Sequence, residues 1–449
     1  MTETPVSRLI PQLAVPTIIS MLVSSIYNMA DTYFVSKLGT SAAGAVGVVF
    51  SVMAIIQAVG FTIGMGGGVI MSRQLGARDN DQATRTASTA FWFSIAMGVL
   101  LAVTGIAFNR QLMGLLGATD TILPYAQAYA QYIFLGCPFM CASFVMNNLL
   151  RSEGKAAFAM VGITAGGLLN IALDPLFIFT FGFGTAGAAI ATSLSQIVSF
   201  IILFAFFAMG KSSVRLQLGM VSGKASHYVS IIKMGLPSLS RQGLASLATV
   251  ALNVSAAAFG DAAVAAMSIT NRITFFLFSA LLGFGQGFQP VCSFNWGAQR
   301  YDRVGQAAKF TCAVGTVMIG LLSAVCFIFA RPLMDCFVTD DPLVTRLGVL
   351  AIRAQCVALP LSGVNVTTNM SLQGTSHYGK ATFLALCRQG IFFIPAVLLL
   401  PVFVGVYGVL CAQGISDVLT FAVSLFFFAG FIRETGEREK RRERDSNPR

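Results

Sequence analysis

The sequence predicts an all-α integral membrane protein with twelve transmembrane helices in two pseudo-symmetric six-helix bundles. Three observations support this fold class. Hydrophobic residues make up 55% of the 449 positions and charged residues only 10%, whereas a soluble globular chain carries roughly 25% charged residues. Apolar runs long enough to cross a hydrocarbon core of about 30 Å recur along the whole chain. The two halves of the chain also repeat each other at a fixed offset, which aligns Pro16 with Pro237.

The internal repeat is the strongest pattern in the sequence. An offset of 221 residues aligns the halves without gaps over most of their length, and the register returns after a short insertion near His377. A duplicated membrane domain is typical of a transporter whose substrate path lies between the copies. The matched pairs include Gly39 and Gly260, Gly64 and Gly285, Gly66 and Gly287, Asn148 and Asn369, and Gly184 and Gly405.

Six apolar runs can be placed in each copy. An even number returns the chain to its starting side, so the two copies share one orientation and form a parallel repeat. The expected spans lie near residues 10–36, 46–72, 84–108, 122–150, 156–181 and 186–209, and near 229–258, 263–294, 304–329, 343–373, 378–401 and 406–432. We therefore expect an N-terminal lobe at 1–209, a polar linker at 210–228, a C-terminal lobe at 229–432 and a charged tail at 433–449.

Basic residues predict the sidedness, because short cytoplasmic segments carry an excess of Lys and Arg. The segments on one face collect most of the basic residues, including seven in the tail from Arg433. The opposite face has only Lys37, Arg110, Arg331 and Arg346. Both termini are therefore expected to be cytoplasmic. The same asymmetry accounts for the formal charge of +11, so no nucleic-acid partner is expected.

Few carboxylates lie well inside the predicted spans, and two of them share one depth. Asp31 precedes Gly39 by eight residues and Asp174 precedes Gly182 by eight residues, so each lies about 12 Å below the outer helix end. Asn170 lies one turn from Asp174 on the same helix face. Thr192 lies at a similar level in the next span. These four residues are the predicted cation-coupling and substrate-binding cluster.

Two acids, an amide oxygen and a hydroxyl can hold a proton or a small hard cation, because neighbouring carboxylates resist ionising together. Oxygen ligands favour Na⁺ or H⁺ over a soft metal. The nine cysteines form no CxxC pair, so neither a metal site nor another cofactor is expected. Local roles are the alternatives: Asp174 could serve the helix break at Pro175, and Asp31 could cap a frayed helix end.

The second half carries arginines in its spans instead of acids. Arg241, Arg272, Arg353 and Arg388 face a single acid, Asp417, and we expect them to pair with it or with helix carbonyls. Asn148 and Asn369 are expected to make hydrogen bonds between helices. Pro16 and Pro237 lie well inside the first helix of each copy and are the candidate hinges.

Four segments together resemble the multidrug and toxic-compound extrusion family of secondary transporters. They are MADTYFVSKLG around Asp31, SRQLGARD with its echo SFNWGAQRYD, NIALDPLFIF around Asp174, and GTAGAAIAT, which ends at Thr192. The resemblance covers essentially the whole chain before the tail. It implies that Asp31, Asn170, Asp174 and Thr192 form the cation-coupling cluster of the N-terminal lobe. One branch of the family also uses acids in helices seven and ten, which this chain lacks, so the resemblance is to the bacterial branch with its cation site in the N-terminal lobe.

These observations predict a secondary antiporter of the bacterial cytoplasmic membrane, and not an enzyme. It would act as a monomer and export amphipathic or cationic organic compounds in exchange for H⁺ or Na⁺. The alternative is a flippase for a lipid-linked saccharide, which the arginines of the second half would suit. A membrane enzyme would need acid or histidine clusters at the membrane border. The only histidines, His227 and His377, have no nearby acidic pair.

Overall fold

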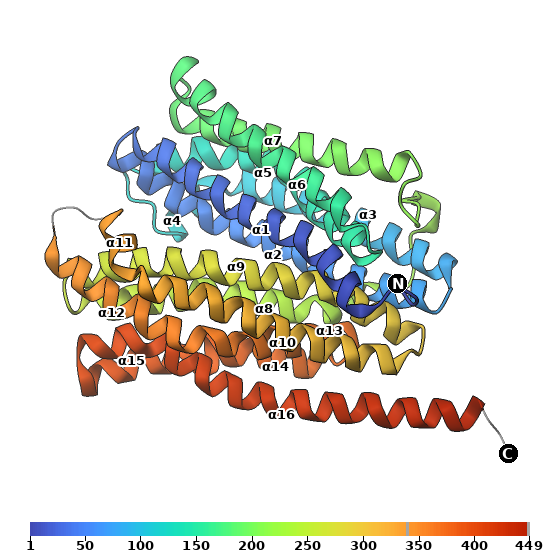
Figure 1. Cartoon of the computed structure of the whole chain (residues 1–449). Coiled ribbons are helices and arrows are strands. Elements are labelled where there is room, and N and C mark those ends of the chain that lie inside the picture. The colour runs from blue at the N-terminus through green and yellow to red at the C-terminus, as the bar shows by residue number, and fades with distance from the viewer. Residues whose placement is uncertain (338–340, 447–449) are drawn as a thin grey trace. The chain divides into compact units, whose positions relative to one another are not determined.

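The computed structural model describes residues 1–337 and 341–446, and in this part of the chain it contains helices and no strand (Figure 1). Eleven helical segments of the described chain are long and apolar enough to cross a membrane. They are α1 (Val6–Ser36), α2 (Thr40–Gly76), α3 (Asn80–Ala107), α5 (Leu123–Ser152), α6 (Ala156–Pro175) with η1 (Leu176–Thr180), α7 (Gly184–Ala208), α9 (Asp261–Gly297), α10 (Tyr301–Ile328), α12 (Pro342–Ala358) with η3 (Leu359–Leu361) and α13 (Ser362–Gly374), α14 (Tyr378–Leu386) with η4 (Cys387–Ile391) and α15 (Phe393–Val404), and α16 (Val406–Ser446).

The twelfth predicted span is α8 (Ala225–Ala257). Its 33 residues would extend about 50 Å as a helix, which is enough to cross a bilayer. Lys233 and Arg241 interrupt its apolar sequence and lower its mean hydropathy. Counted with the eleven apolar segments, α8 completes the twelve-helix fold, and the predicted fold class is confirmed.

The backbone follows the same 221-residue repeat as the sequence. Helices α2 and α9 each contain 37 residues, and α3 and α10 each contain 28. Short helices follow at matching positions, α4 (Asn109–Leu115) and α11 (Ala330–Asp335). Even an unusual conformation is repeated: Arg78 and Gln299 have positive φ angles of 62° and 56°, a region that non-glycine residues adopt rarely. The duplication therefore preserves the turns as well as the spans.

The chain forms two compact units, and each contains part of a helix from the other copy. Unit 1 comprises Met1–Ile18 and Ser240–Arg449, and unit 2 comprises Ile19–Leu239. Helix α1 therefore leaves unit 1 after Ile18, and α8 leaves unit 2 after Leu239. These two positions match at the repeat offset. The lobes expected from sequence divide the chain where the duplication does. In the structure, the first part of α1 instead packs with the second copy, and the first part of α8 packs with the first copy.

Glycines allow the exchanged helix halves to pack closely. In unit 2, a Cβ at Gly66 of α2 would lie 2.0 Å from the carbonyl oxygen of Ile231 in α8. In unit 1, a Cβ at Gly287 of α9 would lie 2.4 Å from the Cα of Ala14 in α1. Gly287 matches Gly66 in the repeat, so the same backbone contact forms once in each unit. At both crossings a larger residue would force the helices apart.

The expected linker at 210–228 is attached to unit 2. It contains η2 (Leu218–Met220), and the Ser88 hydroxyl donates to the carbonyl oxygen of Arg215 and accepts from the backbone N–H of Gln217, both at 3.0 Å. The backbone N–H of Ser213 donates to Glu153 Oε2 at 2.7 Å. Burial raises the pKa of the Glu153 carboxyl, and the hydrogen bonds from the linker oppose that shift. The linker is therefore an ordered part of unit 2.

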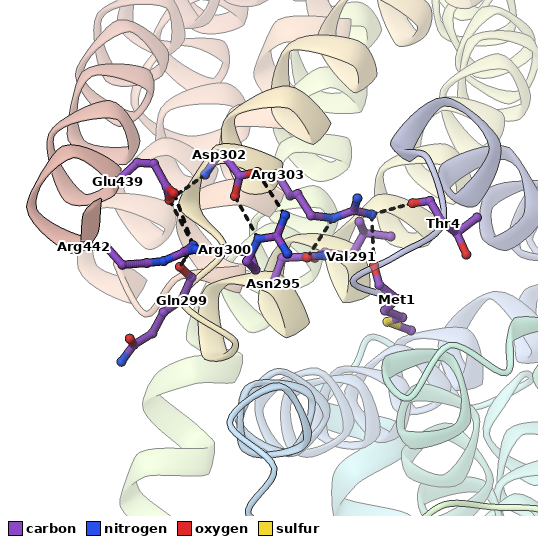
Figure 2. Close-up of polar contacts among 10 residues, drawn as sticks. All are labelled: Met1, Thr4, Val291, Asn295, Gln299, Arg300, Asp302, Arg303, Glu439 and Arg442. Carbon is purple, nitrogen blue, oxygen red and sulfur yellow. Dashed lines mark hydrogen bonds and ion pairs between the residues drawn. The ribbon is translucent and has the colours of Figure 1, made fainter. Parts of the chain in front are cut away.

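The charged tail continues α16 as a helix to Ser446, and residues 447–449 lie outside the described residues. Figure 2 shows that this helix contacts the turn between α9 and α10. Glu439 Oε2 accepts the backbone N–H of Asp302 at 3.1 Å, and Arg442 donates to the carbonyl oxygen of Gln299 at 2.8 Å. Arg303 in the same region donates to backbone oxygens of the N-terminal segment, those of Met1 and Thr4. The tail is therefore part of unit 1.

The asparagines matched by the repeat make different contacts in the two copies. Asn369 donates from α13 to the carbonyl oxygen of Ala381 in α14 at 2.7 Å, as expected. Asn148 instead donates within its own helix to Phe144, so the prediction of a bond between helices is wrong for this residue. Its neighbour Asn147 makes the equivalent contact, to the carbonyl oxygen of Ala159 at 3.0 Å.

The crossing of α2 and α8 can be tested with Gly66→Ala. The new methyl group would collide with backbone, which no side-chain rotation can relieve, so we expect a loss of about 1 to 3 kcal/mol in the free energy of unfolding. Thermal unfolding of the purified chain in detergent measures this. Gly47→Ala is the matched control on the same helix, because a Cβ there meets nothing within 4 Å. Equal unfolding temperatures for both variants would contradict the close packing.

Candidate functional site

The four predicted site residues lie on three helices of unit 2. Asp31 belongs to α1, Asn170 and Asp174 to α6, and Thr192 to α7. Adjacent glycines let these helices approach each other: a Cβ at Gly167 of α6 would lie 3.1 Å from the ring of Tyr27 in α1. The three helices can therefore bring short polar side chains close together.

Three of the four residues are joined by hydrogen bonds. The Asn170 amide N–H₂ group donates two hydrogen bonds. One goes to Asp174 Oδ1 at 3.2 Å and the other to Thr192 Oγ1 at 3.3 Å. All three side chains are buried, and Asp174 has no exposed surface. A buried carboxylate with so few partners is costly in a membrane interior, which makes this cluster a functional candidate.

Asp31 joins the cluster through Tyr129 and through its charge. The Tyr129 hydroxyl donates to Asp31 Oδ2 over a long 3.5 Å, and Asp31 interacts electrostatically with Asp174. Asp31 makes no direct hydrogen bond to Asn170 or Thr192 among the described contacts. The predicted set is therefore assembled as a hydrogen-bonded trio on α6 and α7, with Asp31 beside it on α1.

Sequence reasoning missed Tyr129. This residue is fully buried in α5 within an apolar cluster of unit 2, and a buried tyrosine usually needs a partner for its hydroxyl. It lies six residues after Leu123, where α5 begins, so its depth is similar to that of the acids. Tyr125 and Tyr132 occupy the same stretch, and nothing in the sequence distinguishes the one that reaches Asp31.

Three buried oxygens of the cluster have no hydrogen-bond partner within the described protein. They are Asp31 Oδ1, Asn170 Oδ1 and Asp174 Oδ2. Carboxylate and amide oxygens are suitable ligands for a proton or for a small hard cation such as Na⁺. The described residues contain no group of three His, Cys, Asp or Glu side chains that could hold a metal ion. The donor set thus fits a transported cation.

The local alternatives for the two acids do not match their contacts. Pro175 ends α6, and the chain continues as the π-helix η1, but Asp174 accepts its hydrogen bond from Asn170 and not from the backbone at this break. Asp31 lies five residues before the end of α1 at Ser36 and is 9% exposed. It is therefore buried inside the helix bundle and does not cap a frayed end.

Two of the four arginines in the spans of the second half, Arg388 and Arg353, have different partners in unit 1. Arg388 of η4 pairs with Asp417 of α16 at 2.8 Å, as expected. The guanidinium of Arg353 lies 5.2 Å from the Phe327 ring centroid, and this side chain is exposed. The acids of unit 2 and the arginines of unit 1 therefore form distinct clusters.

The proximity of Asp31 and Asp174 predicts an energetic coupling. Asp31→Asn and Asp174→Asn should each raise stability at pH 9, because each removes a like charge from a buried pair once both acids are ionised. The change in the free energy of unfolding of the double variant should differ from the sum of the two single changes by about 0.5 to 3 kcal/mol. Unfolding of the purified single and double variants measures this cycle. Asp120→Asn in an exposed turn is the control and should be additive with Asp31→Asn. Additivity of the two buried substitutions would disprove the coupling.

Comparisons with known proteins agree with this architecture. The MatE family model matches residues 16–176 and 237–399, two stretches that begin 221 residues apart. Multidrug export protein MepA of Staphylococcus aureus is 26% identical over 418 residues, which cover 93% of this chain and 92% of that protein.

Two solved structures are similar to this chain over nearly its whole length. One is a MATE protein in complex with MaL6, with a TM-score of 0.92 and 27% identity, covering 97% of this chain and 98% of that chain. The other is the outward-facing conformation of a multidrug resistance MATE family transporter of the MOP superfamily, with a TM-score of 0.91 and 27% identity over 97% of both chains. The chain therefore belongs to the MatE family, the multidrug and toxic-compound extrusion transporters that its sequence resembles.

Proposed function

We propose that this chain is a secondary active antiporter that exports amphipathic and cationic organic compounds in exchange for H⁺ or Na⁺. One observation carries the proposal: the buried cluster of Asp31, Asn170 and Asp174 keeps three oxygens free of protein donors. Membership of a transporter family supports a coupling role for this cluster. The similarity to a protein named for multidrug export supports the substrate class.

The chemistry of coupling follows from the shared charge of the two acids. Holding two carboxylates close together and away from water costs energy, and a bound cation lowers that cost. H⁺ or Na⁺ and an organic cation can each supply the positive charge. Binding of the inorganic cation therefore weakens the attraction of the two acids for the organic cation, and the reverse also holds. Export requires that the two ligands also prefer different conformations, since a ligand with equal affinity for both states shifts nothing.

The flippase alternative is less favoured. The cluster of unit 2 does not suit the phosphate of a lipid-linked saccharide, because its unpaired oxygens belong to Asp31, Asp174 and Asn170. The named relatives are multidrug exporters. We therefore assign drug export to this chain and no enzymatic step.

The proposed cellular setting follows the charge pattern of the sequence. The multi-pass chain would reside in the bacterial cytoplasmic membrane with both termini in the cytoplasm, because basic residues gather on that face. We propose a monomer as the working unit. Its substrates would be small amphipathic drugs, with the lipid bilayer as its surroundings.

Pro16 and Pro237 are the proposed hinges. Each lies two residues before the point where its helix passes from one compact unit to the other. A proline removes one backbone hydrogen bond and weakens the helix locally. A change in the coupling site could then bend α1 or α8 without disrupting the packing of either unit.

The coupling role can be tested with Asp31→Asn and Asp174→Asn. Loss of either charged partner should lower ethidium transport roughly tenfold or more, since a contact with a charged group is worth about 1.5 to 3 kcal/mol. The assay is ethidium transport into proteoliposomes driven by a pH gradient or a Na⁺ gradient. The gradient that drives wild-type transport identifies the coupling ion. Asp120→Asn should transport normally, and wild-type rates in both buried variants would refute the proposed coupling site.

The hinges can be tested with Pro16→Ala and Pro237→Ala. Alanine restores the missing helix hydrogen bond, so the helix stiffens, and we expect ethidium transport to slow several-fold while ethidium binding is retained. Pro11→Ala is the control, because Pro11 also lies inside α1 but away from the passage between units. Equal slowing by Pro11→Ala, or loss of binding in the hinge variants, would argue against a hinge.

A further inference from the structure

The interior of unit 1 contains an arginine whose charge is already balanced. Arg388 Nε lies 2.8 Å from Asp417 Oδ1, and Asp417 also accepts a hydrogen bond from Gln413 at 3.1 Å. The guanidinium of Arg388 stacks on Phe278, 4.0 Å from the ring centroid. The Arg388 side chain is 16% exposed and that of Asp417 only 2%. The one acid of this region is therefore used by Arg388.

A second arginine, Arg241, lies beside this pair. Gly390, two residues after Arg388, lets α8 pack against η4, because a Cβ there would lie 3.0 Å from Cδ1 of Leu244. Arg241 lies one turn before Leu244 on α8. Arg241 and Arg388 interact electrostatically as like charges. The two arginines therefore lie near the same helix crossing, where Asp417 pairs with Arg388.

Arg241 has no counter-ion of its own. Among the described residues, no carboxylate lies within ion-pair distance of Arg241, and none of the described hydrogen bonds includes its side chain. The residue is half-buried. An unpaired charge inside a membrane protein is costly and is normally found where a substrate or ion binds. Arg241 and Arg388 carry two positive charges and Asp417 one negative charge, so an anionic ligand would balance the remaining positive charge.

We infer that Arg241, next to the Arg388–Asp417 pair, forms a subsite for the carboxylate of a zwitterionic amphipathic substrate. This inference rests on the proposed export function and adds a residue that would recognise an anionic group of a substrate. A guanidinium presents two parallel N–H donors to a carboxylate, which gives directed recognition as well as charge. The positive part of such a substrate would be bound elsewhere, as for a purely cationic drug.

The depth of Arg241 favours a substrate over a lipid headgroup. It is the middle residue of α8 (Ala225–Ala257), which places it about 24 Å along the helix from each end. Lipid phosphates lie at the membrane surfaces, outside a hydrocarbon core of about 30 Å. An arginine side chain at mid-helix is too far from both surfaces to bind them. An anionic group at this depth therefore has to come with a transported molecule.

The test uses two fluorescent probes that differ only in one carboxylate. Rhodamine 110 carries a free carboxylate, and rhodamine 123 is its methyl ester. Fluorescence anisotropy with the purified full-length chain in phosphatidylcholine nanodiscs gives both dissociation constants. Arg241→Gln should weaken rhodamine 110 binding about tenfold, the range expected for one charged hydrogen-bonded contact, and should leave rhodamine 123 binding unchanged. Arg241→Lys should retain part of the preference for rhodamine 110 over rhodamine 123, because lysine retains the positive charge.

The controls separate this inference from the proposed function. Arg353→Gln, at an exposed arginine, should leave the affinity ratio of the two dyes unchanged. Unchanged rhodamine 123 binding in Arg241→Gln shows that the variant is folded and that the cationic drug site remains. An unaltered ratio in Arg241→Gln, or equal weakening of both dyes, would overturn the subsite while leaving drug export in place. Loss of the wild-type ratio in phosphatidylglycerol nanodiscs would assign the site to lipid and also overturn it.

Discussion

The cost of placing charge inside a membrane governs the internal chemistry of this transporter. The spans contain few charged residues, and several of the least exposed lie in polar clusters. In unit 2 Asn170 donates to Asp174, which interacts electrostatically with Asp31, and in unit 1 Arg388 pairs with Asp417. Each cluster contains a group that the protein itself does not satisfy: free carboxylate oxygens in one and Arg241 in the other. Such groups are tolerated where a ligand completes them.

Duplication explains the scaffold but not this division of charge. The two copies share helix lengths, left-handed turns and the glycine contacts at Gly66 and Gly287. These features depend on backbone geometry and on small residues at the helix crossings. Side chains inside the units are free to diverge because the helix crossings do not depend on them. Thr192, for example, matches Gln413 in the repeat, and each joins the polar cluster of its own unit.

Much of the fold followed from the sequence because lipid imposes simple rules. Length and hydropathy predict the spans, and the repeat aligns the two copies. Depth arguments brought Asn170, Asp174 and Thr192 together correctly, since regular helices convert residue spacing into height. Tyr129 escaped prediction because height alone does not specify the direction in which a side chain points. The exchange of the first halves of α1 and α8 depends on contacts between distant segments, and the packing of Glu439 against the α9–α10 turn does as well. Neither leaves a periodic signal in the chain.

The two clusters together have a consequence for the energetics of export. Exchange of one proton for one monovalent organic cation moves no net charge, so only the concentration gradients can drive it. Exchange of one proton for a zwitterion moves one positive charge inward, and the membrane potential then adds about 2.3 kcal/mol per 100 mV. A transporter that recognises the carboxylate of a zwitterion at Arg241 would therefore export it in exchange for one proton with a larger driving force than a simple cation. The arginine in unit 1 would then affect not only which compounds are bound but also how steeply they can be expelled.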